Sequence, residues 1–362
     1  MKIEQPITPQ RWRQTKDILA EAMELPISER ATFLGQACGQ DDALRAERRF
    51  NDVRKLAHAV VFDYHEAIRD LPGSTPVRER LVKDALEYLD SLANEAGSDA
   101  SLQRELAEAY EKIGDVQGNP YFSNLGNTAG AIASYRKSAQ LREVLLAATP
   151  NDAEARRNLA RSYEGISDVL RETSDLHGAR QQYDRALALA QATAAAEPQN
   201  VKAQVYLAQA LTSLGDIQYR PGAASLGDLS GSLEHHRLAL ALRERLAAPD
   251  PKDPNAQKDI DTSLYLNVTY NRLAEIYRMT GGYDEALGYV RKGQKLVEDA
   301  QTRQPEKANR LHDLAITYRK LAFLLLGNGK EAEAMEYALK SQVLRESLIK
   351  AETQPTRAGK TI

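Results

Sequence analysis

The chain of 362 residues is long enough for two or three ordinary domains, or for one elongated array of helical units. Its 48 basic and 51 acidic residues give a formal net charge of −3, which excludes a strong general attraction to nucleic acid or anionic lipid. Strong helix formers dominate the composition, whereas Phe (5), Trp (1) and Met (4) are scarce, so we expect an all-α fold.

Helical periodicity begins near the N-terminus. Residues 8–25 and 28–38 predict two short helices, which we assign to a separate module over 1–43. Residues 45–70 and 76–96 predict two long helices, and Thr75 can cap the second of them. We expect this pair, residues 44–98, to cap an array that follows.

An internal repeat begins at residue 99. Shifting the chain by 101 residues matches Gly114 to Gly215 and Asp115 to Asp216 without a gap, and a third, shorter copy lies between them, so the unit is about 50 residues. Each unit contains two apolar stripes at helical spacing, separated by a turn. The sequence predicts about five helix-turn-helix units, followed by a tail without apolar period at 351–362. The predicted units are 99–150, 151–199, 200–254, 255–305 and 306–350.

The predicted turns within the units differ in length. Short turns begin at Gly281 and Gly329 in the fourth and fifth units, whereas the first three units are expected to have stretched turns. The longest cover residues 118–127 and 219–228. Because these two match each other residue by residue and lack the Lys and Thr of a phosphate loop, we favour structural turns over anion-binding loops. Tyr121, Phe122 and Tyr219 could still offer a partner an apolar edge.

The first helix of most units carries Leu, a small residue and Tyr at fixed spacing, as in Leu106, Ala107 and Tyr110. This pattern, together with the segment GGYDEAL at 281–287, resembles the tetratricopeptide repeat family. The resemblance implies an α-solenoid of stacked helix-turn-helix repeats, whose first helices line a concave groove. It also implies a non-catalytic protein-interaction scaffold that binds a peptide or a partner helix in that groove and needs no cofactor.

Positions two before and two after the pattern leucines should line this groove. They include Arg104, Arg157, Arg161, Gln209, Asn271, Glu275 and Arg319. The four arginines predict an acidic protein or peptide partner, although exposed helix positions can also be charged for solubility alone. The clamp of Lys and Asn with which chaperone-binding relatives hold a C-terminal carboxylate is not reproduced, because Glu108 occupies one of its asparagine positions.

Residues 7–47 resemble the leader that precedes the catalytic domain in bacterial transmembrane serine/threonine protein kinases. Residues 45–79 are similar to the repeat-bearing tail of the same kinases. A Gly-rich loop and VAIK, HRD and DFG motifs are all missing, so we expect no kinase activity. We therefore expect an adaptor in bacterial signalling. Two alternatives stay open, a component of a kinase system whose catalysis comes from another chain, and an inactive remnant of a kinase gene.

Other reactive residues are scattered. His58, His65, His177, His235, His236 and His312 form no metal-binding pattern, and the single cysteine, Cys38, is too isolated for a disulfide or a zinc site. The N-terminus has no signal-peptide pattern, and the longest apolar run, 321–326, is too short to span a bilayer. We expect a cytoplasmic protein that binds no metal, nucleic acid or membrane.

Overall fold

A computed structural model describes residues 33, 71, 73–95, 97, 99–248, 260–304 and 308–353. The chain divides into two compact units, Met1–Tyr88 and Leu89–Ile362. Apart from Phe33, the predicted N-terminal module and the predicted helix over 45–70 lie outside the described residues, as does Cys38.

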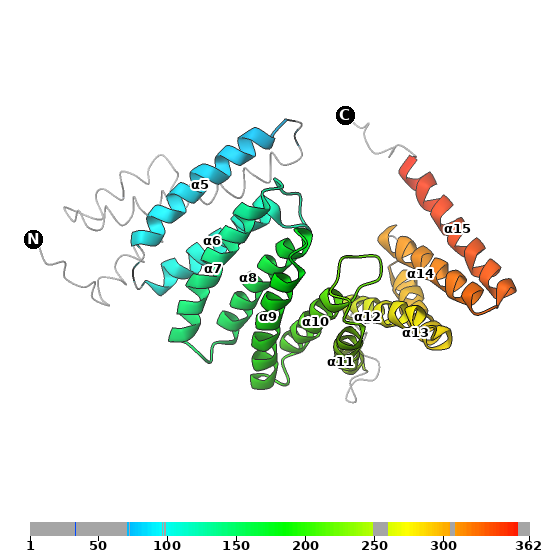
Figure 1. Cartoon of the computed structure of the whole chain (residues 1–362). Coiled ribbons are helices and arrows are strands. Elements are labelled where there is room, and N and C mark those ends of the chain that lie inside the picture. The colour runs from blue at the N-terminus through cyan, green and yellow to red at the C-terminus, as the bar shows by residue number, and fades with distance from the viewer. Residues whose placement is uncertain are drawn as a thin grey trace, which may run out of the picture. The chain divides into compact units, whose positions relative to one another are not determined.

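Helices are the regular secondary structure of the described residues, which contain no strand (Figure 1). They are α5 (Thr75–Glu95), α6 (Ala100–Gly118), α7 (Thr128–Ala148), α8 (Ala153–Glu172), α9 (Leu176–Ala196), α10 (Val201–Gln218), α11 (Leu229–Ala247), α12 (Ile260–Met279), α13 (Tyr283–Arg303), α14 (Ala308–Gly327) and α15 (Glu331–Thr353). The predicted all-α fold is confirmed.

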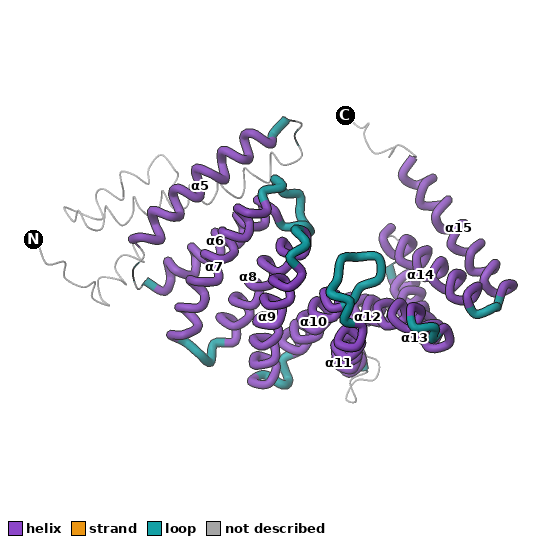
Figure 2. The backbone as a smooth tube through the Cα atoms, in the orientation of Figure 1, coloured by secondary structure: helices purple, strands orange, loops and turns teal. Residues whose placement is uncertain are grey.

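Consecutive helices of the second unit pack against one another along the chain. Helices α6 and α7 form a closely packed pair, as do α8 with α9, α10 with α11, α12 with α13 and α14 with α15. The second helix of each pair also packs against the first helix of the next (Figure 2). Each pair therefore covers the apolar stripe of its neighbour, and the prediction of stacked helix-turn-helix repeats is confirmed.

Close packing explains why glycine recurs in the first helices. The ring of Tyr135 on α7 lies so near Gly114 and Gly165 that a Cβ atom there would stand 2.9 and 2.7 Å from it. One copy later, Gly215 faces the ring of His236 in the same way, with 2.9 Å to Nε2. A larger residue at these glycines would force the neighbouring helices apart.

The long turns have the same base in both copies. The backbone amides of Leu125 and Asn127 donate to the carbonyls of Val116 and Gln117. One copy later, the amides of Leu226 and Asp228 donate to the carbonyls of Ile217 and Gln218. These paired hydrogen bonds fix both ends of each loop, so the loops project from the same place in the repeat (Figure 2).

The prediction of a stretched turn in the second unit is wrong. Only residues 173–175 separate α8 from α9, as few as separate α12 from α13. Ser174 takes the left-handed conformation, with φ 66°, that glycine supplies at Gly281, with φ 83°. Asp175 then caps α9 by accepting from the amide of Gly178. Sequence reasoning missed this turn because it lacks glycine.

The last helix also differs slightly from the prediction. Helix α15 continues to Thr353, beyond the expected end of the fifth repeat at residue 350. Ala351 and Glu352 are good helix formers, and the first residue that proline disfavours as helical is Gln354, which precedes Pro355.

Candidate functional site

Two cavities lie on the first helices of the repeats, both within the second unit. The upstream cavity has a volume of about 680 Å³ and is lined mainly by α6 and α8. The downstream cavity, of about 390 Å³, is lined mainly by α12 and α14. Both volumes fall within the range of about 300–1,000 Å³ typical of ligand pockets.

The upstream cavity is strongly charged, with more acidic than basic groups. Its cationic residues are Arg104, Lys112, Arg142 and Arg161, and its carboxylate residues are Glu105, Glu108, Glu111, Asp115, Asp152 and Glu154. An acidic ligand would therefore meet more repulsion than attraction there.

Much of the positive charge in the upstream cavity is already used by the protein. Arg161 lies 2.6 Å from one carboxylate oxygen of Glu111, and Arg142 pairs with the other. Arg142 also donates to the Asn158 carbonyl at 2.6 Å and to the Ser162 hydroxyl at 2.8 Å. Because Glu111 and Arg142 are both buried, this cluster joins α6, α7 and α8 as part of the core.

The downstream cavity has a more apolar lining. Ala274, Val290, Phe323 and Leu324 supply carbon surface from α12, α13 and α14. The Phe323 side chain is 59% exposed, so apolar surface is open to solvent at this cavity. The loop between α10 and α11 closes one side of the cavity with Pro221 and Gly222.

The polar groups of the downstream cavity are Asn271, Glu275, Arg278, Arg319 and Lys320. Lys320 lies 3.3 Å from Glu275 and donates to the Asn271 side-chain oxygen at 3.0 Å. Burial lowers the pKa of Lys320, and Glu275 offsets this in part. Within the described part of the chain, Arg278 and Arg319 form no ion pair with a carboxylate. Two cations therefore remain uncompensated at this cavity.

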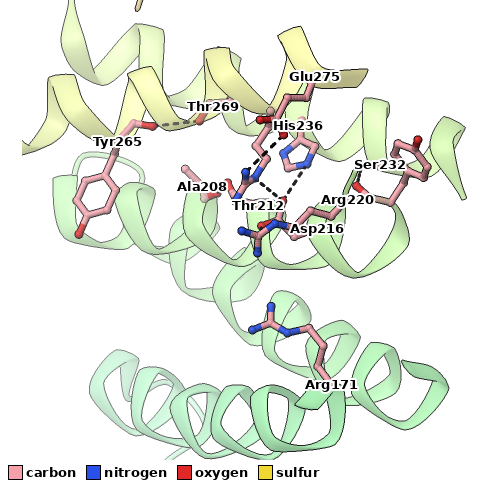
Figure 3. A network of polar contacts seen from close by, with 12 residues as sticks. Arg171, Ala208, Thr212, Asp216, Arg220, Ser232, His236, Tyr265, Thr269 and Glu275 are labelled. Atoms are coloured by element: carbon pink, nitrogen blue, oxygen red, sulfur yellow. Dashed lines mark hydrogen bonds and ion pairs between the residues drawn. The ribbon is translucent and has the colours of Figure 1, made fainter. Parts of the chain in front are cut away.

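A buried polar cluster lies beside the downstream cavity and joins α10, α11 and α12 (Figure 3). Asp216 lies 2.8 Å from Arg272, 3.5 Å from His236 and 3.7 Å from Arg220. Burial alone would raise the pKa of Asp216, but His236, Arg272 and Arg220 together hold it below its ordinary value. Arg272 also lies 3.9 Å from Glu275, which connects this cluster to the cavity lining.

The structure divides the predicted groove residues between several places. Arg104 and Arg161 line the upstream cavity, and Asn271, Glu275 and Arg319 line the downstream one. Arg157 and Gln209 line neither, and Arg157 lies 3.8 Å from Glu197.

Sequence reasoning missed several residues of the downstream cavity. Phe323 stands two positions after Leu321, so the spacing that nominated Arg319 also points to it. Arg278 follows Ala274 by four residues, which places it on the same helix face. Pro221 and Gly222 carried no such signal, because the direction of a loop depends on packing that the sequence does not display.

The described residues contain no group of three or more His, Cys, Asp or Glu side chains arranged to hold a metal ion. In the same part of the chain, no helix combines the length and apolar character needed to cross a membrane.

Comparison with known proteins relates the chain to solved helical repeat structures. BtubC (BKLC) from P. vanneervenii is similar over 78% of this chain and 97% of its own, at 16% sequence identity and a TM-score of 0.54. The likeness is one of fold. The apo form of RapI matches at 13% identity over 81% of this chain and 99% of its own, with a TM-score of 0.45. A putative kinesin light chain from Podosopora anserina with TPR-like repeats matches at 16% identity over 71% of this chain and 98% of its own, with a TM-score of 0.38.

No protein-family model and no curated protein matches this sequence.

Proposed function

We propose that this chain is a non-catalytic scaffold, whose first helices bind a peptide or a partner helix. The observation that carries the proposal is the position of the two cavities, which both lie on first helices of the stacked pairs. Cavities repeated along one face suit an extended ligand, because successive side chains of such a ligand can enter successive recesses.

The site offers binding groups in place of a catalytic arrangement. Arg142 and Glu111 of the upstream cavity are buried and paired with each other, which favours a structural role. At the downstream cavity, Glu275 pairs with both Arg272 and Lys320, which likewise favours a structural role.

We further propose a cytoplasmic setting in bacterial signalling, supported by the resemblance of residues 7–47 and 45–79 to parts of serine/threonine kinases. The same resemblance supports a component of a kinase system or an inactive remnant as alternatives. Incubating the full chain with labelled ATP and magnesium tests whether the chain itself is a kinase. A component whose catalysis comes from another chain would transfer no phosphate on its own.

A random dodecapeptide library displayed on phage, selected against the full chain, tests the scaffold directly. We expect enriched peptides whose binding slows amide hydrogen exchange in α6, α8, α12 or α14. Enrichment of no peptide, or protection confined to the second helices α7, α9, α11 and α13, would contradict the proposed function.

A further inference from the structure

The two long loops have the same base but contact different parts of the fold. In the first copy, the Tyr121 hydroxyl accepts a hydrogen bond of 2.6 Å from Arg171, and the Arg171 guanidinium lies over the Tyr121 ring. That loop therefore packs on the end of α8. In the second copy, Pro221 and Gly222 line the downstream cavity. The same insertion thus covers a helix end in one unit and forms the wall of a cavity in another.

We propose that the downstream cavity is a specificity pocket for an acidic peptide segment that presents one large apolar side chain, with the loop 219–228 as its wall. This inference rests on the proposed function and names the chemistry of the partner.

The apolar part of the lining favours a large apolar side chain. Phe323 exposes most of its ring beside the cavity, and Leu324, Val290 and Pro221 add carbon surface around it. Covering these groups removes apolar surface from water, which is the main favourable term in most associations. The volume of about 390 Å³ leaves room for such a side chain.

The charges around the cavity favour acidic neighbours of that side chain. The lining contains the cations Arg278, Arg319 and Lys320 and a single carboxylate, Glu275. Glu275 already pairs with Lys320 at 3.3 Å, so the two arginines determine the local potential. Arg278 also lies 5.4 Å from the centre of the Phe323 ring, next to the apolar surface. Acidic residues on both sides of the apolar peptide residue can therefore pair with Arg278 and Arg319.

The upstream cavity supplies an internal comparison. Carboxylates outnumber cations there, and Arg161 is paired with Glu111 at 2.6 Å. An acidic segment should therefore prefer the downstream cavity, although both lie on first helices. This difference allows one selected set of peptides to test the two cavities separately.

The test uses the peptides selected from the random dodecapeptide library, synthesised with a fluorescent label and titrated with the full chain. We expect peptides rich in Asp and Glu around one Phe, Leu, Ile or Trp. Arg319→Glu should weaken their binding about tenfold or more, because it replaces an attraction by a repulsion. Arg345→Glu is the matched control, since Arg345 is another exposed arginine but lies on α15 and lines neither cavity. It should change affinity by less than about twofold. Arg104→Glu reports separately on the upstream cavity.

Two further pairs of variants test the apolar lining of the downstream cavity and the loop 219–228. Phe323→Ala should weaken binding about tenfold, whereas Leu326→Ala should not, although both side chains are 59% exposed on α14 and only Phe323 lines the cavity. Pro221→Asp should weaken binding of acidic peptides more than Ala223→Asp, which adds the same charge to an exposed position of the same loop. Circular dichroism checks that every variant retains its helix content.

The outcomes separate this inference from the proposed function. Binding that depends on Arg319, Phe323 and Pro221 supports both. Peptides that protect first helices but are neutral or basic, or that depend on Arg104 and not on Arg319, overturn the specificity pocket and leave the scaffold in place. Absence of any selected peptide overturns both.

Discussion

Burial of Glu164 on α8 leads to a specific prediction about pH. Its Oε1 atom is buried, and burial raises the pKa of the side chain from 4.5 to about 7, although the Tyr206 hydroxyl offsets this in part. The folded protein therefore binds the Glu164 proton more tightly than the unfolded chain does. It follows that the contribution of Glu164 to stability is complete below pH 4.5 and is lost as the pH rises through about 7.

The difference between 4.5 and about 7 corresponds to a loss on the order of 3 kcal/mol at high pH. Glu164→Gln keeps the shape of the protonated side chain and cannot ionise. We expect this variant to match the parent protein near pH 4, below the unfolded-state pKa, and to be more stable by about 3 kcal/mol at pH 8. Urea unfolding followed by circular dichroism at both pH values measures the difference. Hydrogen exchange in α8 is measured as well, because repeat arrays can unfold in parts and circular dichroism reports only on the whole chain.

Two features of the experiment isolate Glu164. The pKa of Asp168 is also raised, to about 6, so both proteins should still lose stability as the pH increases, and only the difference between them reports on Glu164. Glu154→Gln removes an exposed carboxylate near the other end of α8 from Asp168 and is the control for the substitution itself. If Glu164→Gln and the parent protein differ equally at pH 4 and pH 8, the reasoning about burial is refuted.

Three other sets of substitutions probe the packing of the repeats. Gly165→Ala should destabilise the protein by about 1–3 kcal/mol in urea unfolding, since its Cβ would meet a neighbouring ring at 2.7 Å, whereas Gly288→Ala, with open space around it, should stabilise it by about 0.5–1 kcal/mol. Arg142→Met should cost about 3–5 kcal/mol, because it leaves Glu111 buried with only one cation, and adding Glu111→Leu should recover most of that loss. Asp152→Ala should cost about 1 kcal/mol and speed hydrogen exchange in the first turn of α8, whose amides Asp152 caps; unchanged exchange would contradict this.

The fold could be predicted from the sequence because its cause is periodic. Leu106, Ala107 and Tyr110 are all buried, as the repeated pattern requires, and the matched glycines occur where a ring leaves no room for a Cβ atom. The buried pattern residues and the glycines contact side chains of adjacent helices in the same array, which the repeated sequence also specifies. A single register at an offset of 101 residues therefore contains most of the information that defines the helices and their stacking.

The site was less predictable, because it depends on pairing between different units. Spacing identified Arg161 and Arg319 as exposed cations on first helices, but only the structure shows that Arg161 pairs with Glu111 whereas Arg319 pairs with no carboxylate of the described residues. Likewise, the sequence shows that two loops match, but not that one of them contributes Pro221 to a cavity. Local pattern defines the positions on a helix face, and tertiary contacts decide which of them remain available to a ligand.

One difference between the two matched copies connects the repeat to the downstream cavity. In the first copy, Asp115 accepts a hydrogen bond of 2.6 Å from Tyr135. The equivalent position in the later copy is His236, which lies 3.5 Å from the matching Asp216 (Figure 3). Asp216 also lies 2.8 Å from Arg272 of the following unit.

Arg272 in turn lies 3.9 Å from Glu275, which pairs with Lys320 in the cavity lining. Replacing a tyrosine by a histidine thus accompanies a new contact between units, because an aspartate that lacks the tyrosine hydroxyl needs another partner. Divergence at one core position can therefore orient charged groups in the lining of the downstream cavity while the repeat fold stays the same.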